Sequence, residues 1–246
     1  MSDKPVYRPA PVLMPQSGRR IDKIPERMGG PSLTSESARA RLVETLRGLG
    51  ISQPSVLAVM ARVPRHLFVD EAFASRAYEE AALPIGYKQT ISRPFTVARY
   101  AEHALQGRSR LGRVLEVGAG CGYQAAVFSE FCAGIVSIER IEALYAKARA
   151  NLLHAGYPQV QVLHGDGLLG YPPQAPFDVI IVAAAGLDVP EALLKQLKVG
   201  GRLIVPLETQ GQQVLTLIDR VSENHWKRET RDLVKFVPLL QGVRDF

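Results

Sequence analysis

Cysteine and long apolar runs are scarce in this sequence. Only Cys121 and Cys132 occur among its 246 residues, too few for a disulfide framework or a cysteine-based metal cluster. No apolar run approaches the roughly 18 residues of a membrane helix, and the first residues carry no apolar core of a secretory signal. We therefore expect no membrane span and no metal site, and two unpaired cysteines favour a cytoplasmic location.

A charge excess is also missing from most of the chain. The formal net charge is +6, but residues 1–34 hold six Lys or Arg and three Asp or Glu, which leaves only +3 for residues 35–246. Such a weak excess argues against specific nucleic-acid binding by the folded part. Residues 1–34 also contain six prolines and no sustained periodicity, so we expect a disordered leader before a single domain over residues 35–246.

The sequence lacks the third glycine of a dinucleotide-binding loop. The apolar run Val114–Val117 is followed by Gly118, Gly120 and Gly122 at alternating positions. A Gly-x-Gly-x-x-Gly fingerprint would need a glycine where Tyr123 stands. Glycines at this spacing let the backbone pass close to a ligand, and their pattern favours a nucleoside over a pyrophosphate.

Strands and helices alternate along the second half of the chain. The expected strands are Val114–Val117, Ile135–Ile138, Val160–His164, Phe177–Val182, Arg202–Pro206 and Gln213–Asp219. The expected helices between them are Tyr123–Phe131, Ile141–His154 and Pro190–Leu197. This alternation predicts an α/β fold with a mostly parallel sheet covered by helices on both faces. Two helical stretches between Ser35 and Pro64 predict a short helical N-terminal segment.

Acidic residues follow two of the expected strands. Glu139 comes directly after Ile135–Ile138, where a carboxylate can accept hydrogen bonds from both ribose hydroxyls of a nucleoside. Asp166 and Gly167 follow the next strand, where the side chain can reach an adenine amino group. Each feature alone is also compatible with a turn, a solvated ion pair or a helix cap. Because ligands of such sheets bind at the carboxyl ends of the strands, the three signals together predict a nucleoside site.

This pattern resembles that of class I S-adenosylmethionine-dependent methyltransferases, which implies a Rossmann-like, seven-stranded sheet whose last strand is antiparallel. Methyltransferases that act on amine nitrogens carry Asn/Asp-Pro-Pro-Tyr/Phe after the fourth strand. Residues 182–186 read Val-Ala-Ala-Ala-Gly instead, so no side chain there can grip a planar amine. The sequence therefore argues against nucleic acids and amide nitrogens as substrates.

Further motifs between Ser35 and Gly242 resemble the protein-L-isoaspartate (D-aspartate) O-methyltransferase family. They are Val63–Ala72, Ala82–Gly86, Gln89–Ser92, Val114–Ala126, Ser137–Arg140, Ala175–Val182, Gln196–Leu203 and Arg231–Gly242. Three positions depart from the family pattern. Lys88 stands where the family has glycine, Ala183 stands where it has threonine, and Arg93 stands where glutamine is common.

The resemblance implies an enzyme, a protein-L-isoaspartate O-methyltransferase, with S-adenosyl-L-methionine as cofactor and isoaspartyl proteins or peptides as partners. It would methylate the α-carboxylate of L-isoaspartyl residues in damaged proteins and so start their repair through a succinimide. Ser92 would be catalytic. The cofactor would be bound by Thr90, Ile91, Gly118, Gly120, Gly122, Glu139, Asp166 and Gly167. The peptide would be held by Val237, Pro238, Leu239 and Leu240.

The chemistry suits these residue types. A carboxylate is ionised at neutral pH and needs no general base, so a neutral hydroxyl such as that of Ser92 can orient it without binding it as tightly as a lysine would. Ser92 is also compatible with a simple turn or cap. Two other functions remain open: a related carboxyl methyltransferase for a dedicated peptide or small acid, and a nucleic-acid-binding protein that retains the fold. We expect a monomer.

Overall fold

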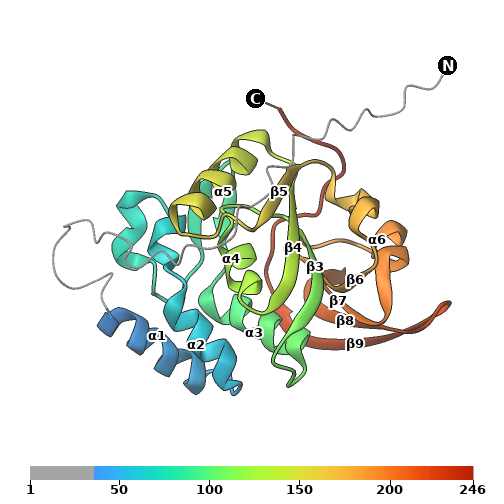
Figure 1. Ribbon diagram of the computed structural model, residues 1–246, viewed down its shortest axis with the longest axis horizontal. Helices are drawn as coiled ribbons and strands as arrows, with labels where there is room; N and C mark the ends of the chain where they lie inside the picture. Colours follow the sequence, from blue (N-terminus) through green and yellow to red (C-terminus); the bar gives the residue numbers. More distant parts are fainter. Residues whose placement is uncertain (1–35, 246) are drawn as a thin grey trace. The chain divides into compact units, whose positions relative to one another are not determined.

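The computed structural model describes residues 36–245, so the expected leader and the expected domain start at residue 35 lie outside the described part. The strands are β1 (Leu83–Gly86), β2 (Gln89–Ile91), β3 (Leu111–Val117), β4 (Cys132–Glu139), β5 (Gln161–His164), β6 (Phe177–Val182), β7 (Leu197–Thr209), β8 (Gln212–Ser222) and β9 (His225–Val234). The α-helices are α1 (Glu36–Gly48), α2 (Pro54–Arg62), α3 (Pro94–Leu105), α4 (Tyr123–Ser129), α5 (Glu142–His154) and α6 (Glu191–Gln196). Short 3₁₀ helices are η1 (Arg65–Phe68), η2 (Glu71–Arg76), η3 (Gly167–Leu169) and η4 (Pro172–Gln174). Figure 1 shows their arrangement.

Seven strands form one sheet in the order β5-β4-β3-β6-β7-β8-β9, and β1 and β2 form a separate hairpin. The strands from β5 to β7 in this order are parallel to one another, whereas β8 is antiparallel to β7 and β9 is antiparallel to β8. From β3 the chain adds β4 and β5 on one side of the sheet and then β6 and β7 on the other. The strand order therefore reverses between β3 and β6, which creates a crevice at the carboxyl ends of these strands. The expected fold class, a mostly parallel seven-stranded sheet with helices on both faces, is confirmed.

The direction of the last strand differs from the expectation. The strand that runs against the parallel five is β8, whereas β9 runs with them because two successive hairpins reverse the chain twice. The first hairpin turns at Gln210 and Gly211, which both have positive φ angles of 52° and 76°. A two-residue connection permits only antiparallel neighbours. The sequence did not predict β9, because its exposed residues hide the alternation that marks a half-buried strand.

The sheet separates two hydrophobic cores, since alternate residues of a strand point to opposite faces. Val114, Ile135 and Val179 belong to the core under helices α1 to α5. Their neighbours Leu115 and Val136 belong to the other core, which contains residues of α6. Figure 1 shows α4 and α5 on one side of the sheet and α6 on the other. Both faces of the sheet are therefore covered, and the crevice formed by the carboxyl ends of the strands is left for a ligand.

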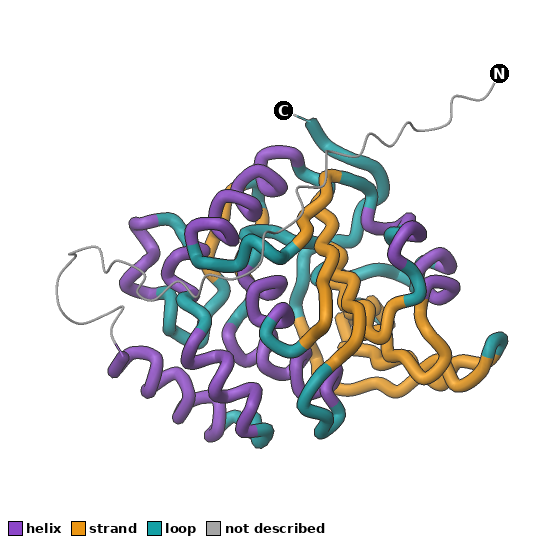
Figure 2. Tube along the Cα trace, viewed as in Figure 1, coloured by secondary structure: helices purple, strands orange, loops and turns teal. Residues whose placement is uncertain are grey.

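The N-terminal helices pack together beside the sheet, and Figure 2 shows them as a purple group at the lower left. Prolines set their limits: Pro54 and Pro94 start α2 and α3, where a missing amide hydrogen is harmless. Pro64 follows the last residues of α2 and turns the chain into η1. Among residues 36–245, no helix has the length and apolarity required to cross a membrane.

Candidate active site

A pocket at the carboxyl ends of the parallel strands gathers distant parts of the chain. Its wall comes from residues 89–92 at the end of the β1–β2 hairpin, residues 118–121 of the glycine loop (Gly118–Gly122), residues 138–141 at the end of β4, and residues 237–240. Gly167 and the loop after β6 contribute as well. The strand ends that the sequence singled out thus meet in one place, together with segments far away in the sequence.

The glycine loop has a backbone that other residues adopt with strain. Gly118, Gly120 and Gly122 have φ angles of +95°, +56° and +89°. A β-carbon on Gly122 would lie 3.0 Å from Leu152 of α5, and one on Gly120 would lie 3.2 Å from Ile85 of the hairpin. The alternating glycines therefore serve both the tight turn and the close approach of α5 and the hairpin.

Glu139 fixes the glycine loop to the end of β4. Its side chain is almost fully buried, and its two carboxylate oxygens accept hydrogen bonds from the amides of Gly120 (2.8 Å) and Ile141 (3.0 Å). Burial raises the pKa of this carboxyl, and the amide hydrogen bonds oppose that rise. Each oxygen has a second lone pair, so the group can also accept from hydroxyls of a ligand in the pocket.

Asp166 lies beside the pocket rather than in its wall. One carboxylate oxygen accepts from the amide of Leu168 (2.9 Å) and caps η3, and the other accepts from the amide of Gly242 (2.8 Å). Its neighbour Gly167 does line the pocket, where a β-carbon would come within 2.3 Å of Val117. The structure therefore brings Gly167 into the predicted site but gives the Asp166 side chain two structural partners.

The β1–β2 hairpin brings Thr90, Ile91 and Ser92 to the pocket. Its turn residues Tyr87 and Lys88 have φ angles of +53° and +60°, so both occupy the left-handed region that a two-residue hairpin of this kind requires. A glycine would fit position 88 without strain, and lysine does not. From α5, the Lys147 ammonium donates to the carbonyl of Ile85 (3.1 Å) and anchors the hairpin against the site.

The closing segment (Val237–Asp245) runs across the crevice. The Ala185 amide donates to the carbonyl of Val237 (2.8 Å), and the Leu239 amide donates to the carbonyl of Ala185 (2.7 Å). Further along, the Arg140 guanidinium donates to the carbonyl of Gly242 (2.9 Å). Residues 237–240 are thus fixed to the loop after β6, and the next residues are fixed to the end of β4.

A buried acid next to the glycine loop was not singled out in the sequence. Glu116 of β3 is fully buried and accepts hydrogen bonds from Gln124 (3.1 Å) and from the Ser137 hydroxyl. Burial raises the pKa of Glu116 to about 8. The signal that could have revealed it is a charged residue inside an otherwise apolar strand, Val114–Val117.

The fold and the pocket together define the class of protein. A mostly parallel seven-stranded sheet with a glycine loop after β3 and an acidic residue after β4 is the arrangement of a Rossmann-like class I methyltransferase. The comparison with known families is more specific, because a profile of the protein-L-isoaspartate(D-aspartate) O-methyltransferase family matches residues 37–244. The chain belongs to this family, as its motifs indicated.

Individual relatives agree with this assignment. Protein-L-isoaspartate O-methyltransferases of Burkholderia pseudomallei (strain 668) and Burkholderia thailandensis are each 54% identical over 216 residues, which are 87% of this chain. The chain spans about two thirds of their length, 67% and 66%. A solved protein-L-isoaspartate O-methyltransferase superposes with a TM-score of 0.74 at 29% identity, covering 81% of this chain and 65% of that one.

A second solved structure shares the fold at lower identity. It comes from Plasmodium falciparum, is described as a member of the same enzyme family and was crystallised with S-adenosyl-L-homocysteine. It superposes with a TM-score of 0.72 at 23% identity and covers 82% of this chain and 98% of that one. The superpositions confirm the expected fold class, and the family profile and the curated relatives confirm the expected family and methyltransferase class.

Proposed function

We propose that this protein transfers the methyl group of S-adenosyl-L-methionine to the α-carboxylate of L-isoaspartyl residues in damaged proteins or peptides. The observation that supports it is the meeting of two predicted half-sites in one pocket. The glycine loop and Glu139 form one half, whereas Ser92 and residues 237–240 form the other. Methyl transfer requires a donor and an acceptor held in line at contact distance, which such a shared pocket provides.

The first half fits the proposed cofactor. The glycine loop lets its ligand approach the backbone, and Glu139 retains acceptor capacity for ribose hydroxyls. Among the described residues of the wall, Arg140 is the only basic one, and its guanidinium is held by carbonyls of the closing segment. A ligand without phosphates matches this site, which has no cluster of cations to neutralise them. When bound, the cofactor supplies a methyl group already activated by a positive sulfur.

The second half fits a carboxylate acceptor. The acceptor oxygen is ionised at neutral pH and attacks without a general base, so the chain need only orient and desolvate it. We assign Ser92 as the hydroxyl that donates to this carboxylate, and residues 237–240 as the segment that holds the peptide backbone. The buried side chains of Ile85 and Ile91 limit the access of water. The backbone amide nitrogen of the next peptide residue then attacks the methyl ester and expels methanol, and the resulting succinimide hydrolyses in part to aspartate.

The remaining binding roles follow the same division of the pocket. We assign Thr90, Ile91, Gly118, Gly120 and Gly167 to the wall around the cofactor, whereas Gly122 does not line the pocket and supports the turn of the loop against α5. Asp166 supports the cofactor side through η3 and the closing segment, since it lies outside the pocket wall and accepts from amides of both segments. We also propose that the protein acts as a monomer in the cytoplasm and has no specific nucleic-acid partner.

The test is a comparison of two peptides that differ only in one linkage. The purified protein and S-adenosyl-L-methionine with a labelled methyl group are incubated with an isoaspartyl peptide and with its aspartyl isomer. We expect methyl ester to form on the isoaspartyl peptide and none on the isomer. Equal transfer to both peptides, or none to either although the cofactor binds, would contradict the proposal. Cofactor binding without transfer to either peptide would favour a dedicated peptide or small acid as the acceptor, in line with the departures from the family pattern at Lys88 and Ala183.

A further inference from the structure

A buried guanidinium lies behind the acceptor half of the pocket. The side chain of Arg65 is fully buried, although arginine is rarely buried without an acidic partner. No carboxylate of the described residues forms an ion pair with it; its charge is distributed instead over main-chain carbonyls and one aromatic ring. Burial lowers the pKa of Arg65, so a neutral side chain of similar size would fill this position at a lower desolvation penalty.

The hydrogen bonds of Arg65 end on the segment that carries Ser92. Its Nη2 donates to the carbonyl of Ser92 at 2.7 Å, and its Nε donates to the carbonyl of Ala77 at 2.7 Å. A longer contact of 3.5 Å joins Nη2 to the carbonyl of Ala81. One planar group thus ties the end of the β1–β2 hairpin to the chain after η2, which no sheet connects to it.

The same guanidinium contacts the cofactor half. Its carbon lies 4.7 Å from the ring centre of Tyr123, the first residue of α4 and the one that follows Gly122. Phe68, from the same short helix as Arg65, packs edge-on against this ring at 5.6 Å. A cation over an aromatic face at this distance is a favourable contact, and it is stronger when buried. Arg65 therefore contacts both the chain that leaves the glycine loop and the chain that carries Ser92.

Ser92 depends on its backbone for its orientation. Its hydroxyl makes no hydrogen bond to any residue that the structure describes, so no side-chain partner fixes its direction. Its carbonyl, by contrast, is held by Arg65, and the next residues Arg93 and Pro94 begin α3. We propose that Arg65 is a positioning residue for methyl transfer, which holds the Ser92 backbone so that the hydroxyl meets the acceptor carboxylate. This inference rests on the proposed function.

The test is a double-mutant cycle between Arg65→Lys and Ser92→Ala. Lysine keeps the charge but cannot donate from two nitrogens in one plane, so the carbonyls of Ala77 and Ser92 can no longer be held together. We expect kcat on the isoaspartyl peptide to fall about 10-fold to 100-fold, as for a misplaced catalytic group, while the Kd for S-adenosyl-L-homocysteine stays within about 3-fold. In the Ser92→Ala background the same change should lower kcat by less than about 2-fold, because the hydroxyl that Arg65 orients is already gone.

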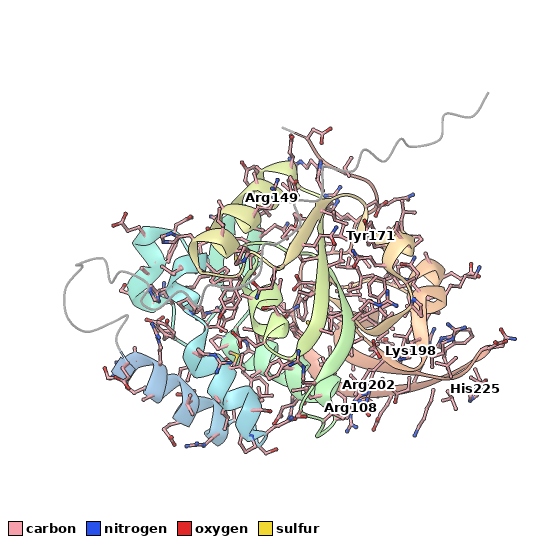
Figure 3. All side chains as sticks on the ribbon, in the orientation of Figure 1. Arg108, Arg149, Tyr171, Lys198, Arg202 and His225 are labelled. Carbon is pink, nitrogen blue, oxygen red and sulfur yellow. The ribbon has the colours of Figure 1, made fainter. Side chains whose placement is uncertain are left out.

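Arg202→Lys serves as the matched control. Arg202 also lies largely buried, pairs with Asp219 through two nitrogens at 2.6 and 2.7 Å and donates to the carbonyl of His103 at 3.0 Å. It lies at the opposite edge of the sheet, the lower one in Figure 3. We expect this variant to lose stability, to keep the wild-type kcat, and to show no coupling to Ser92→Ala.

The outcomes separate the two hypotheses. Wild-type protein that does not methylate the isoaspartyl peptide contradicts the proposed function itself. An active wild type in which Arg65→Lys lowers kcat by the same factor with and without the Ser92 hydroxyl overturns the positioning role, as does a Ser92→Ala variant with full activity. If Arg65→Lys does not fold, Arg65→Met removes the buried charge and enters the same cycle. Arg65→Met with wild-type kcat would equally refute the inference.

Discussion

At the scale of single residues, burial and backbone geometry decide what the pocket residues do. Glu116 and Glu139 are both buried acids near the glycine loop, but their partners differ. Glu139 accepts from two amides and lines the pocket, whereas Glu116 is bonded to side chains and is raised to a pKa of about 8. A carboxyl with so high a pKa is largely protonated at neutral pH, so it acts as a neutral hydrogen-bonding group in the fold.

We predict that Glu116 makes the protein less stable as the pH rises. The folded state keeps a proton on this carboxyl up to about pH 8, whereas the unfolded chain releases it near the ordinary pKa of 4.5. Between these values the unfolded state binds fewer protons, so the free energy of unfolding falls with increasing pH. Urea unfolding of the wild type and of Glu116→Gln from pH 5 to pH 8 measures this. The isosteric amide should flatten the slope, and two parallel curves would refute the assignment. Glu139 is present in both proteins, so most of its own titration is common to the two curves, although its charge contributes to the raised pKa of Glu116.

Lys88 should strain the hairpin turn. At a φ of +60° a residue with a β-carbon is destabilised by about 1–2 kcal/mol, and glycine is not. Because glycine also loses more entropy on folding, we expect Lys88→Gly to raise the free energy of unfolding by about 0.5–1 kcal/mol in chemical denaturation. The matched control is Lys195→Gly on the exposed face of α6, where the same change should destabilise by about 1 kcal/mol. A loss of stability at both positions would contradict a left-handed Lys88.

At the scale of elements, the site depends on segments held by side chains rather than by a sheet. The β1–β2 hairpin is anchored by Lys147 and Arg65, and the closing segment by Arg140 and Asp166. Each anchor is a side chain of another element that bonds a segment carrying a proposed substrate or cofactor contact. Loss of an anchor should therefore affect one segment and leave the sheet intact.

Asp166→Ala tests the anchor of the closing segment. The Gly242 amide would lose an acceptor worth about 1–1.5 kcal/mol, so the amides of residues 241–245 should exchange with deuterium about 10-fold faster. The matched control is Asp188→Ala, whose carboxylate contacts its own loop and Arg228 among residues 36–245 and should leave these amides unchanged. Exchange at the wild-type rate in Asp166→Ala would show that this hydrogen bond does not hold the segment.

At the scale of the whole molecule, the pocket joins parts of both cores and of the N-terminal and C-terminal halves. Gly118 and Glu139 belong to the sheet, the hairpin comes from the chain before it, and residues 237–240 come from the chain after it. A ligand that contacts all of these segments binds the folded state only, and it should stabilise the molecule as a unit.

We therefore predict a thermal shift with S-adenosyl-L-homocysteine. At a concentration of 100 times Kd the ligand should add about 2.7 kcal/mol, which corresponds to a rise in Tm of about 5–10 °C for a domain of this size. Differential scanning calorimetry of Glu139→Gln should show most of that shift lost at the same ligand concentration. Ser92→Ala, on the acceptor side, should keep it. A full shift in Glu139→Gln would refute the ribose contact of Glu139.

The sequence by itself determined the succession of the parallel strands along the chain, the glycine loop and the family, because these depend on local patterns: apolar runs, glycine spacing and motifs of a few residues. Only the tertiary structure decided which side chains face the pocket. Asp166 and Glu139 look alike in the sequence, yet one is bonded to the closing segment and the other lines the site. The sequence did not predict the burial of Arg65 or the strand β9, since burial and strand direction depend on contacts between residues far apart in the chain. Glu116 stands out as a charge in an apolar strand, but only the structure shows its hydrogen-bond partners. Local interactions determine which helices and strands form. The packing between these elements determines the environment of each side chain, and hence its chemistry.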